Sequence, residues 1–216
     1  MVDIANGRET PAPVTALATA ERPVPGTGHR PGTGERGAAG TTARADATFT
    51  LTGRTAAAAR YLLAGIRLAL GWVFLWAFLD KLYGLGHGTA SGGAWVNGGS
   101  PTAGFLGKAT AGPFTGFYQS IAGSVVADVL FMAALLGIGA ALLLGIGMRV
   151  AAAAGALLTV LMWTAVLPPA SNPFMDDHLI YAAVLIVLAL LGAGNTWGLG
   201  HTWAATPLVR RNPWLT

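Results

Sequence analysis

Beyond residue 50, the charged side chains of this 216-residue chain are sorted by the ends of long apolar segments, and this sorting constrains the fold most strongly. Acidic residues stand at one set of segment ends: Asp80, Asp128, Asp176 and Asp177. Arginines stand at the opposite set: Arg54, Arg60, Arg149, Arg210 and Arg211. A soluble protein has no reason to sort charges by alternate helix ends, whereas one face of a bilayer retains Arg and Lys. The pattern therefore predicts a polytopic membrane protein with its acidic residues on the outer side.

The composition supports a membrane protein and excludes several other classes. Hydrophobic residues make up 53% and charged residues 10% of the chain, whereas soluble domains carry roughly 25% charged residues. A net charge of +4 does not indicate a nucleic-acid partner, because about half of the basic residues lie in the first 60 positions and alternate there with acidic ones. The chain has no cysteine, which excludes thiolate-ligated iron–sulfur clusters and c-type haem attachment. It also shows no flavin motif and no recognised metal-ligand spacing.

The apolar segments predict four transmembrane helices, over about residues 60–83, 124–148, 150–167 and 178–194. In the first, residues 62–79 extend about 27 Å at a rise of ~1.5 Å per residue, enough to cross the hydrocarbon core. Residues 1–55 are rich in Pro, Gly, Thr and Ala. Such a segment buries too little apolar area to fold, so we expect a disordered cytoplasmic tail. The expected fold class is all-α: an integral membrane four-helix bundle formed by residues 56–216.

The remaining segments are expected to lie at the membrane surfaces. Residues 84–123 are too polar and Gly-rich to span, so we expect one or two short interfacial helices on the outer face, with Phe105 and Tyr118 among the interfacial aromatic residues. Residues 196–216 contain three tryptophans and are expected to form an interfacial tail on the inner side. Four spans put both termini on the same side of the membrane, and the arginines at that side make it the cytoplasmic one. The chain is therefore expected to be a multi-pass protein of the cell membrane.

Two features lie inside the predicted helices. Ala133, Gly137, Ala141 and Gly145 follow one another at i+4 spacing and form a stripe of small residues that would let another helix approach closely. Arg67 is an intramembrane charge. Its side chain could extend towards the cytoplasmic surface, or it could face the interior of the bundle, where ionisable residues are candidates for function. The sequence leaves both alternatives open.

The end of the first helix is a candidate cofactor-binding site. Trp72, Trp76, Asp80 and Tyr83 share one helix face. Asp80 stands at a helix C-terminus, where the helix dipole disfavours a carboxylate, so it needs a partner from another helix or a bound ligand. Trp and Tyr beside a carboxylate would suit a quinone head group. The alternative is that the aromatic residues belong to the core or to a lipid-facing belt.

The start of the fourth helix is a candidate site for proton transfer. His178 and Tyr181 share a face there, and His178 adjoins Asp177. Histidine titrates near neutral pH, so His178 together with Asp177 or Asp80 would deliver the protons that quinone reduction requires. The alternative is that His178 only forms a hydrogen bond at the helix start, and that an adjacent aspartate only caps the helix. Lys81 and Lys108, on the same side of the membrane, would attract an anionic substrate.

Several sequence pieces, taken in order, resemble the DoxX/DoxD family of small membrane proteins. They are residues 67–74, 80–82, 97–106, 112–114 and 172–181. The resemblance covers about residues 60–200. It implies a four-helix bundle and, for the best-known branch of the family, the membrane subunit of a thiosulfate:quinone oxidoreductase that pairs with a second, different subunit.

The leading functional hypothesis is a membrane subunit of a quinone-linked oxidoreductase that oxidises thiosulfate to tetrathionate on the outer face. Quinone is then the electron acceptor, with Trp72, Trp76, Tyr83 and Tyr181 as its contacts. The alternative is a non-catalytic scaffold that anchors a redox partner at residues 84–123. Either protein would have the lipid bilayer as its surroundings, and either could associate with a second oxidoreductase subunit or with further copies of the chain.

Overall fold

The structure, a computed structural model, describes residues 52–170 and 172–216, which lie within one compact unit, Phe49–Thr216. The described residues form helices and no β-strand, so the all-α prediction is confirmed for them. Most of the expected disordered tail, residues 1–51, lies outside the described residues. Helices α1 (Gly53–Tyr83), α3 (Val125–Leu144) and α4 (Met148–Ala165) are long and apolar enough to cross a membrane.

The fourth predicted segment forms a shorter helix. Helix α5 (Asp177–Leu190) is apolar but has 14 residues. At ~1.5 Å per residue it extends about 21 Å, less than the ~30 Å hydrocarbon core of a typical bilayer. The structure therefore shows three candidate spans and one shorter apolar helix in place of the four full spans expected from the sequence.

Helix ends coincide with residues that cap helices. Helix α1 begins at Gly53, earlier than expected, and ends at Gly84, whose φ of 67° suits glycine and whose N–H donates to the carbonyl of Asp80 at 2.8 Å. Ser124 caps α3 by accepting a hydrogen bond from the N–H of Ala127. Helix α3 ends at Gly145, with φ 71°, so it is shorter than the predicted 124–148 segment.

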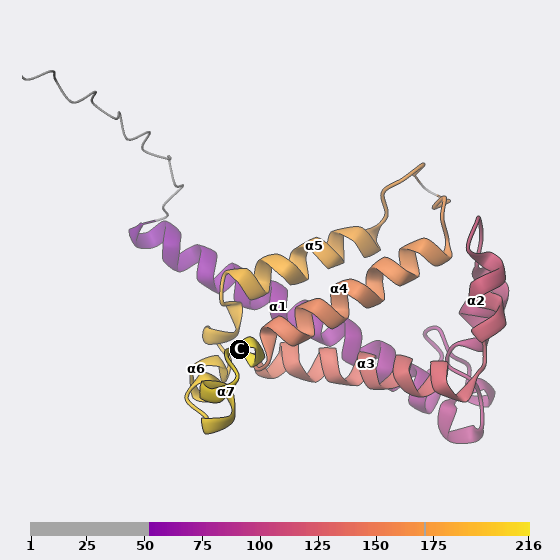
Figure 1. The fold of residues 1–216 in the computed structure, drawn as a ribbon, viewed down its shortest axis with the longest axis horizontal. Coiled ribbons are helices and arrows are strands. Elements are labelled where there is room, and N and C mark those ends of the chain that lie inside the picture. Colours follow the sequence, from indigo (N-terminus) through magenta and orange to yellow (C-terminus); the bar gives the residue numbers. More distant parts are fainter. Residues whose placement is uncertain (1–51, 171) are drawn as a thin grey trace, which may run out of the picture. The chain divides into compact units, whose positions relative to one another are not determined.

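The long helices pack in the order α1–α3–α4–α5 (Figure 1). Glycine permits the closest approach: a Cβ on Gly139 of α3 would lie 2.8 Å from the backbone nitrogen of Leu75 in α1. The predicted stripe of small residues packs only at its end: a Cβ on Gly137 would meet nothing within 4 Å, whereas a Cβ on Gly145 would lie 2.7 Å from the carbonyl oxygen of Gly194. The small residues therefore do bring helices together, but through Gly139 on a different face of α3. Leu70, Phe74, Met132, Leu135, Leu142, Leu185 and Leu188 are among the buried core residues.

Short helices lie at the two ends of the long ones (Figure 1). At one end, between α1 and α3, are η1 (Ser91–Gly93), η2 (Trp95–Asn97), the π-helical turn η3 (Phe105–Ala109) and α2 (Thr115–Ile121). At the other, after α5, are η4 (Ala193–Asn195), α6 (Gly200–Ala204), α7 (Pro207–Arg211) and η5 (Pro213–Leu215). We call these the acidic end, which holds Asp80, Asp128, Asp176 and Asp177, and the arginine end.

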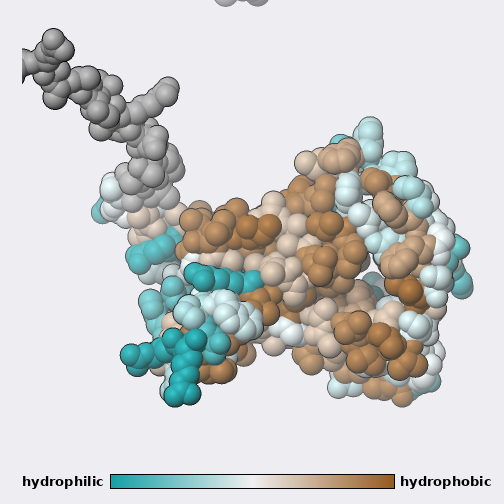
Figure 2. Space-filling model, viewed as in Figure 1, coloured by the Kyte–Doolittle hydropathy of each residue, from teal (hydrophilic) through white to brown (hydrophobic). Residues whose placement is uncertain are grey.

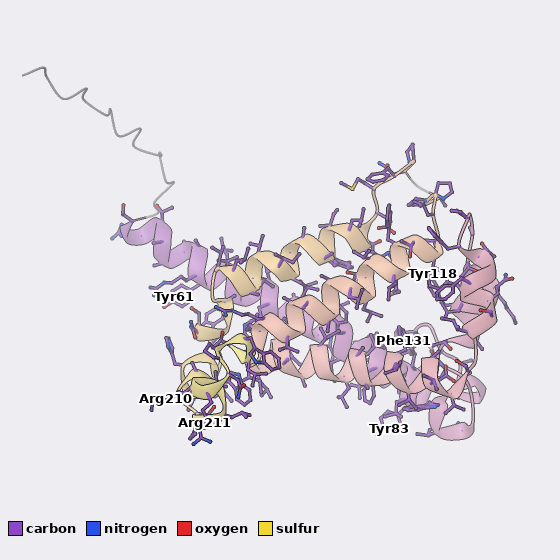
Figure 3. The ribbon with its side chains drawn as sticks, in the orientation of Figure 1. Tyr61, Tyr83, Tyr118, Phe131, Arg210 and Arg211 are labelled. Atoms are coloured by element: carbon purple, nitrogen blue, oxygen red, sulfur yellow. The ribbon has the colours of Figure 1, made fainter. Side chains whose placement is uncertain are left out.

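The molecular surface follows this division. Figure 2 shows hydrophobic residues over the middle of the long helices and hydrophilic residues concentrated at the arginine end. Arg210 and Arg211 extend away from the helices there, whereas Tyr83 and Tyr118 lie at the acidic end (Figure 3). Many large side chains on the long helices are exposed, for example Leu130 at 65% and Leu190 at 78%. An exposed apolar band between two polar ends is compatible with a protein that is embedded in a bilayer.

Candidate functional site

At the acidic end, a buried carboxylate fastens the segment before α2 to the start of α3. Asp128 lies in the first turn of α3 and is 6% exposed. Its Oδ1 accepts three hydrogen bonds: from Ser100 Oγ at 2.9 Å, Thr102 N at 3.0 Å and Thr102 Oγ1 at 2.6 Å. The Thr102 hydroxyl accepts in turn from the N–H of Gly123 at 3.1 Å. Asp128 is therefore more than a favourable charge at a helix start, because it organises the connection around it.

A second set of contacts fastens the same connection to the end of α4. The N–H of Ala111 donates to the carbonyl of Ala165 at 2.9 Å. Tyr118 of α2 is 6% exposed, and its hydroxyl donates to the carbonyl of Leu161 at 3.0 Å and bonds the hydroxyl of Thr164. Helix α2 and Ala111 are thus attached to α4, while residues 100–102 are attached to α3.

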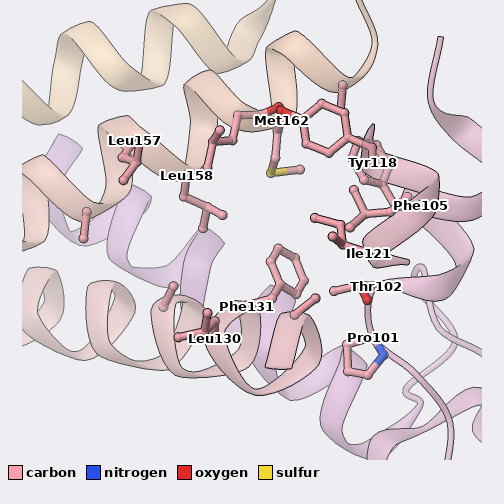
Figure 4. A pocket seen from close by; sticks show the side chains of 16 residues that line it. Pro101, Thr102, Phe105, Tyr118, Ile121, Leu130, Phe131, Leu157, Leu158 and Met162 are labelled. Carbon is pink, nitrogen blue, oxygen red and sulfur yellow. The ribbon is translucent and has the colours of Figure 1, made fainter. Parts of the chain in front are cut away.

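These attachments border an apolar cavity between α3 and α4 that is partly open to the surface. Its volume is about 390 Å³, within the range of small-molecule sites. Figure 4 shows Phe131 of α3, Leu158 and Met162 of α4, Phe105 of η3 and Tyr118 of α2 around it. The Tyr118 and Thr102 hydroxyls on the wall already bond protein atoms. The cavity therefore offers shape, aromatic faces and aliphatic surface to a molecule that dissolves in the bilayer.

Sequence reasoning missed this cavity. It placed Phe105 and Tyr118 at the membrane interface, whereas the structure places both on the cavity wall. Of the aromatic residues in the same segment, Phe114 and Phe117 are exposed, at 47% and 61%. The sequence does show two aromatic-containing pieces, residues 100–106 and 112–118. Nothing in their spacing indicates that they border a cavity between two distant helices.

The aromatic stripe on α1 reaches a histidine that the sequence analysis did not place in the site. Trp72 and Trp76 lie with ring centroids 5.7 Å apart, and Trp76 lies edge-on to His87 at 5.4 Å. Asp80 is 4% exposed, and its Oδ1 accepts a hydrogen bond from the backbone N–H of His87 at 3.1 Å. The partner that Asp80 needs is therefore supplied by the loop that follows its own helix. Tyr83, in the last turn of α1, is 55% exposed.

At the start of α5, Asp176 is the N-cap and accepts hydrogen bonds from the N–H groups of His178 and Leu179. The His178 Nδ1 lies 2.8 Å from Asp176 Oδ2 and 3.5 Å from Asp177 Oδ1. Asp176 is thus the nearer carboxylate, whereas the sequence offers Asp177 or Asp80 as the partner of His178. Tyr181, one turn later, packs half-buried against the core.

Asp176, Asp177 and His178 could each offer one metal-ligand atom, and these atoms all lie within 4.8 Å of one another. Acidic groups gather at helix N-termini without a metal, because the free N–H groups and the dipole favour them there. The arrangement at Asp176, Asp177 and His178 is accounted for by capping and by the His178–Asp176 contact, and no metal role is assigned to it.

Asp80 and His178 have different partners. Asp80 bonds the loop after α1, and His178 bonds Asp176, the N-cap of α5. The two lysines also differ. Lys81 is half-buried, and its Nζ lies 6.0 Å from the centre of the Phe131 ring, which lines the cavity. Lys108, in η3, is exposed. Lys81 therefore lies beside a residue of the cavity wall.

Arg67 faces the interior and binds backbone carbonyls. It is fully buried. Its Nη1 donates to the carbonyls of Leu142 and, at 3.1 Å, Leu143, and its Nη2 donates to those of Thr196 at 3.2 Å and Trp197 at 2.9 Å. Leu142 and Leu143 are in the last turn of α3, where carbonyls lack intrahelical partners and the dipole favours a cation. Arg67 therefore joins three segments, and the interior alternative of the sequence analysis holds.

Comparison of the chain with protein-family models, with curated proteins and with solved structures gave no match.

Proposed function

We propose that this chain is the quinone-binding membrane subunit of an oxidoreductase, and that membrane quinone occupies the cavity between α3 and α4. The observation that carries the proposal is the cavity itself: about 390 Å³ of apolar space between two helices that are long enough to cross a membrane. Phe105, Phe131 and Tyr118 supply aromatic faces for a flat quinone ring, and Leu158 and Met162 supply aliphatic surface for its isoprenoid chain.

The proposed quinone site differs from the aromatic stripe on α1 that the sequence favours. Trp72 is 52% exposed, so the stripe meets the lipid, whereas the cavity is bounded by four elements. In the cavity, the Tyr118 hydroxyl can donate to a quinone oxygen by exchanging its bond with the Leu161 carbonyl. Lys81, whose Nζ lies 6.0 Å from the centre of the Phe131 ring, brings a positive charge towards the developing quinol anion or towards an anionic donor.

The proposed topology is a four-helix transmembrane bundle with the arginine end in the cytoplasm. Helices α1, α3, α4 and α5 pack in sequence, and the described arginines outside the helix interior lie at one end. Retention of Arg on the cytoplasmic side then places both termini inside the cell and the acidic end outside. Helix α5 would cross with a thinner local bilayer or with help from η4, because 14 residues alone are short.

The proposed reaction joins two half-reactions at the acidic end. Two thiosulfate ions form one S–S bond to give tetrathionate and release two electrons, and the quinone takes up these two electrons and two protons to become the quinol. His178, held by Asp176, is the proposed proton carrier at this end. A second subunit on the outer face would bind the sulfur anions. The resemblance to the DoxX/DoxD family leads to the same class of reaction.

The cavity is tested by the quinone content of the purified full-length chain. Extraction in mild detergent, followed by solvent extraction and quantification, should give a stoichiometric amount of quinone. Leu158→Trp and Ala127→Phe, which fill the cavity from α4 and α3, should remove most of it. Leu136→Trp, a change of the same kind on an exposed part of α3, should leave it unchanged. A folded protein that carries no quinone, even after reconstitution with added quinone, would overturn the assignment.

A second candidate function is a scaffold, and one observation favours it. Residues 84–123 are fastened to both α3 and α4, so the acidic end presents a firm surface with Val96, Phe114 and Phe117 exposed. A scaffold would carry no quinone. The redox function further requires thiosulfate-dependent quinone reduction by membranes that contain the chain together with its neighbouring gene products. A rate equal to that of empty membranes would leave the scaffold as the function.

A further inference from the structure

A hollow of about 270 Å³ at the arginine end has a different character from the cavity between α3 and α4. It lies between the first half of α1 and the segment that joins α5 to α6. Arg60, Asn195, Thr196 and His201 supply its polar side, and Leu63 and Leu191 its apolar side. The proposed quinone site is at the acidic end, so this hollow has no part in it.

The hollow is positively charged. Within residues 52–170 and 172–216, the four aspartates lie at the acidic end, and neither the guanidinium of Arg60 nor the imidazole of His201 forms a hydrogen bond or an ion pair with a protein group. Both side chains are exposed. Asn195 adds an amide beside them. A guanidinium with an adjacent imidazole and amide matches the oxygens of a phosphate group.

The wall of the hollow is fixed in place. Arg67 stands two helical turns after Arg60 on α1 and holds the carbonyl of Thr196, a lining residue, at 3.2 Å. The next residue, Trp197, has a φ of 51°, which is unusual for a residue other than glycine. Its carbonyl accepts a second bond from Arg67 at 2.9 Å. The buried arginine therefore positions the loop that supplies one side of the hollow.

The surroundings place the hollow at the level of lipid head groups. Tyr61, next to Arg60, lies with its ring 5.2 Å from that of Trp197, and both rings are about half exposed or more. Tyr and Trp collect at the membrane–water boundary. Leu191, which lines the hollow, is 62% exposed, and Leu62 of α1 and Leu190 at the end of α5 are exposed at 68% and 78%. These leucines suit the acyl chains of a lipid whose head group enters the hollow.

We infer that this hollow binds the head group of an anionic phospholipid, with the lipid phosphate against Arg60 and His201 and the acyl chains along α1 and α5. Basic pockets between helices on the cytoplasmic side of a membrane are suited to such lipids, because the anionic leaflet and the pocket have opposite charges. The bound lipid would then stabilise the contact between α1 and the connection from α5 to α6.

The inference is tested with the purified full-length chain in detergent, titrated with phosphatidylglycerol and followed by native mass spectrometry. Phosphatidylglycerol should bind, and phosphatidylcholine should bind much more weakly. Arg60→Gln should weaken phosphatidylglycerol binding about fivefold, the effect of one basic group near a lipid surface. Arg210→Gln removes an exposed arginine of α7 at the same end, outside the lining residues, and should change the binding little.

Three results would overturn the inference. Equal weakening by Arg60→Gln and Arg210→Gln would show a diffuse attraction to surface charge. Equal binding of phosphatidylcholine would show that the negative charge is not recognised. Displacement of the lipid by glycerol phosphate at equal concentration would show a site for a soluble anion. Circular dichroism of each variant, which should match that of the unchanged chain, excludes unfolding as the cause, and none of these readouts depends on quinone.

Discussion

Replacement of Arg67 by methionine should strongly destabilise the protein. Methionine keeps much of the side-chain length but has no donor, so the carbonyls of Leu142, Leu143, Thr196 and Trp197 lose the hydrogen bonds that Arg67 donates to them. Buried carbonyls without donors cost free energy, and at this site they belong to the end of α3 and to a loop with an unusual backbone angle.

The size of the effect follows from two opposing contributions. A hydrogen bond from a charged donor contributes about 1.5–3 kcal/mol, so four of them amount to about 6–12 kcal/mol. Removing the guanidinium also removes the cost of keeping a charge out of water, which is several kcal/mol, and the Nε of Arg67, which has no partner among the described residues, adds to that cost. The expected net loss in the free energy of unfolding is about 3–5 kcal/mol.

The assay is unfolding in mixed micelles with increasing denaturing detergent, followed by circular dichroism. Ile66→Met, a change on the exposed side of the same turn, is the control and should alter the free energy of unfolding by less than about 0.5 kcal/mol. Arg67→Lys keeps the charge but loses the planar fork, so it should fall between the two. If the free energy of unfolding of Arg67→Met lies within about 1 kcal/mol of that of the unchanged chain, the four carbonyls do not depend on Arg67 as argued.

Two further predictions concern α3. Gly139→Ala should lower the free energy of unfolding, because its Cβ would lie 2.8 Å from the backbone nitrogen of Leu75. Gly137→Ala, which has open space around it, should raise the free energy of unfolding by up to about 1 kcal/mol. Thermal unfolding of the two variants measures both effects, and equal effects would contradict the packing of α3 against α1. Asp128→Ala should release the segment around Thr102 and speed its amide hydrogen exchange with α1 unchanged, and unaltered exchange there would refute the role of Asp128.

The sequence predicted the helices well because their signals are local. Long apolar runs, a Gly at the end of α1 and of α3, and an Asp before α5 each act within a few residues. The errors are of one or two turns, as at the start of α1, where a run of alanines extends the helix back to Gly53. The early end of α5 at Leu190 was not predicted, because apolar and small residues continue to residue 194.

The candidate sites could be predicted only in part, because they depend on contacts between distant segments. Asp80 was expected to take its partner from another helix or a ligand, whereas it bonds the His87 backbone, because the loop after Gly84 folds back onto its own helix. The i+4 stripe at Gly137 was a sound pattern, but which face of α3 meets α1 is decided by the fit of whole surfaces. The position of Tyr118 on the cavity wall could not be predicted, because it depends on the hydrogen bond between α2 and the end of α4.

The sequence by itself determined an all-helical chain with charges sorted to opposite ends of apolar helices, because hydrophobicity and charge act on each segment separately. The tertiary structure decided what those charges do. It turned Arg67 into a donor for carbonyls of two distant segments and Asp128 into the anchor of residues 100–102. It also opened the space between α3 and α4. Each depends on segments tens of residues apart meeting with matched shape and polarity, and no spacing within one segment encodes such a meeting.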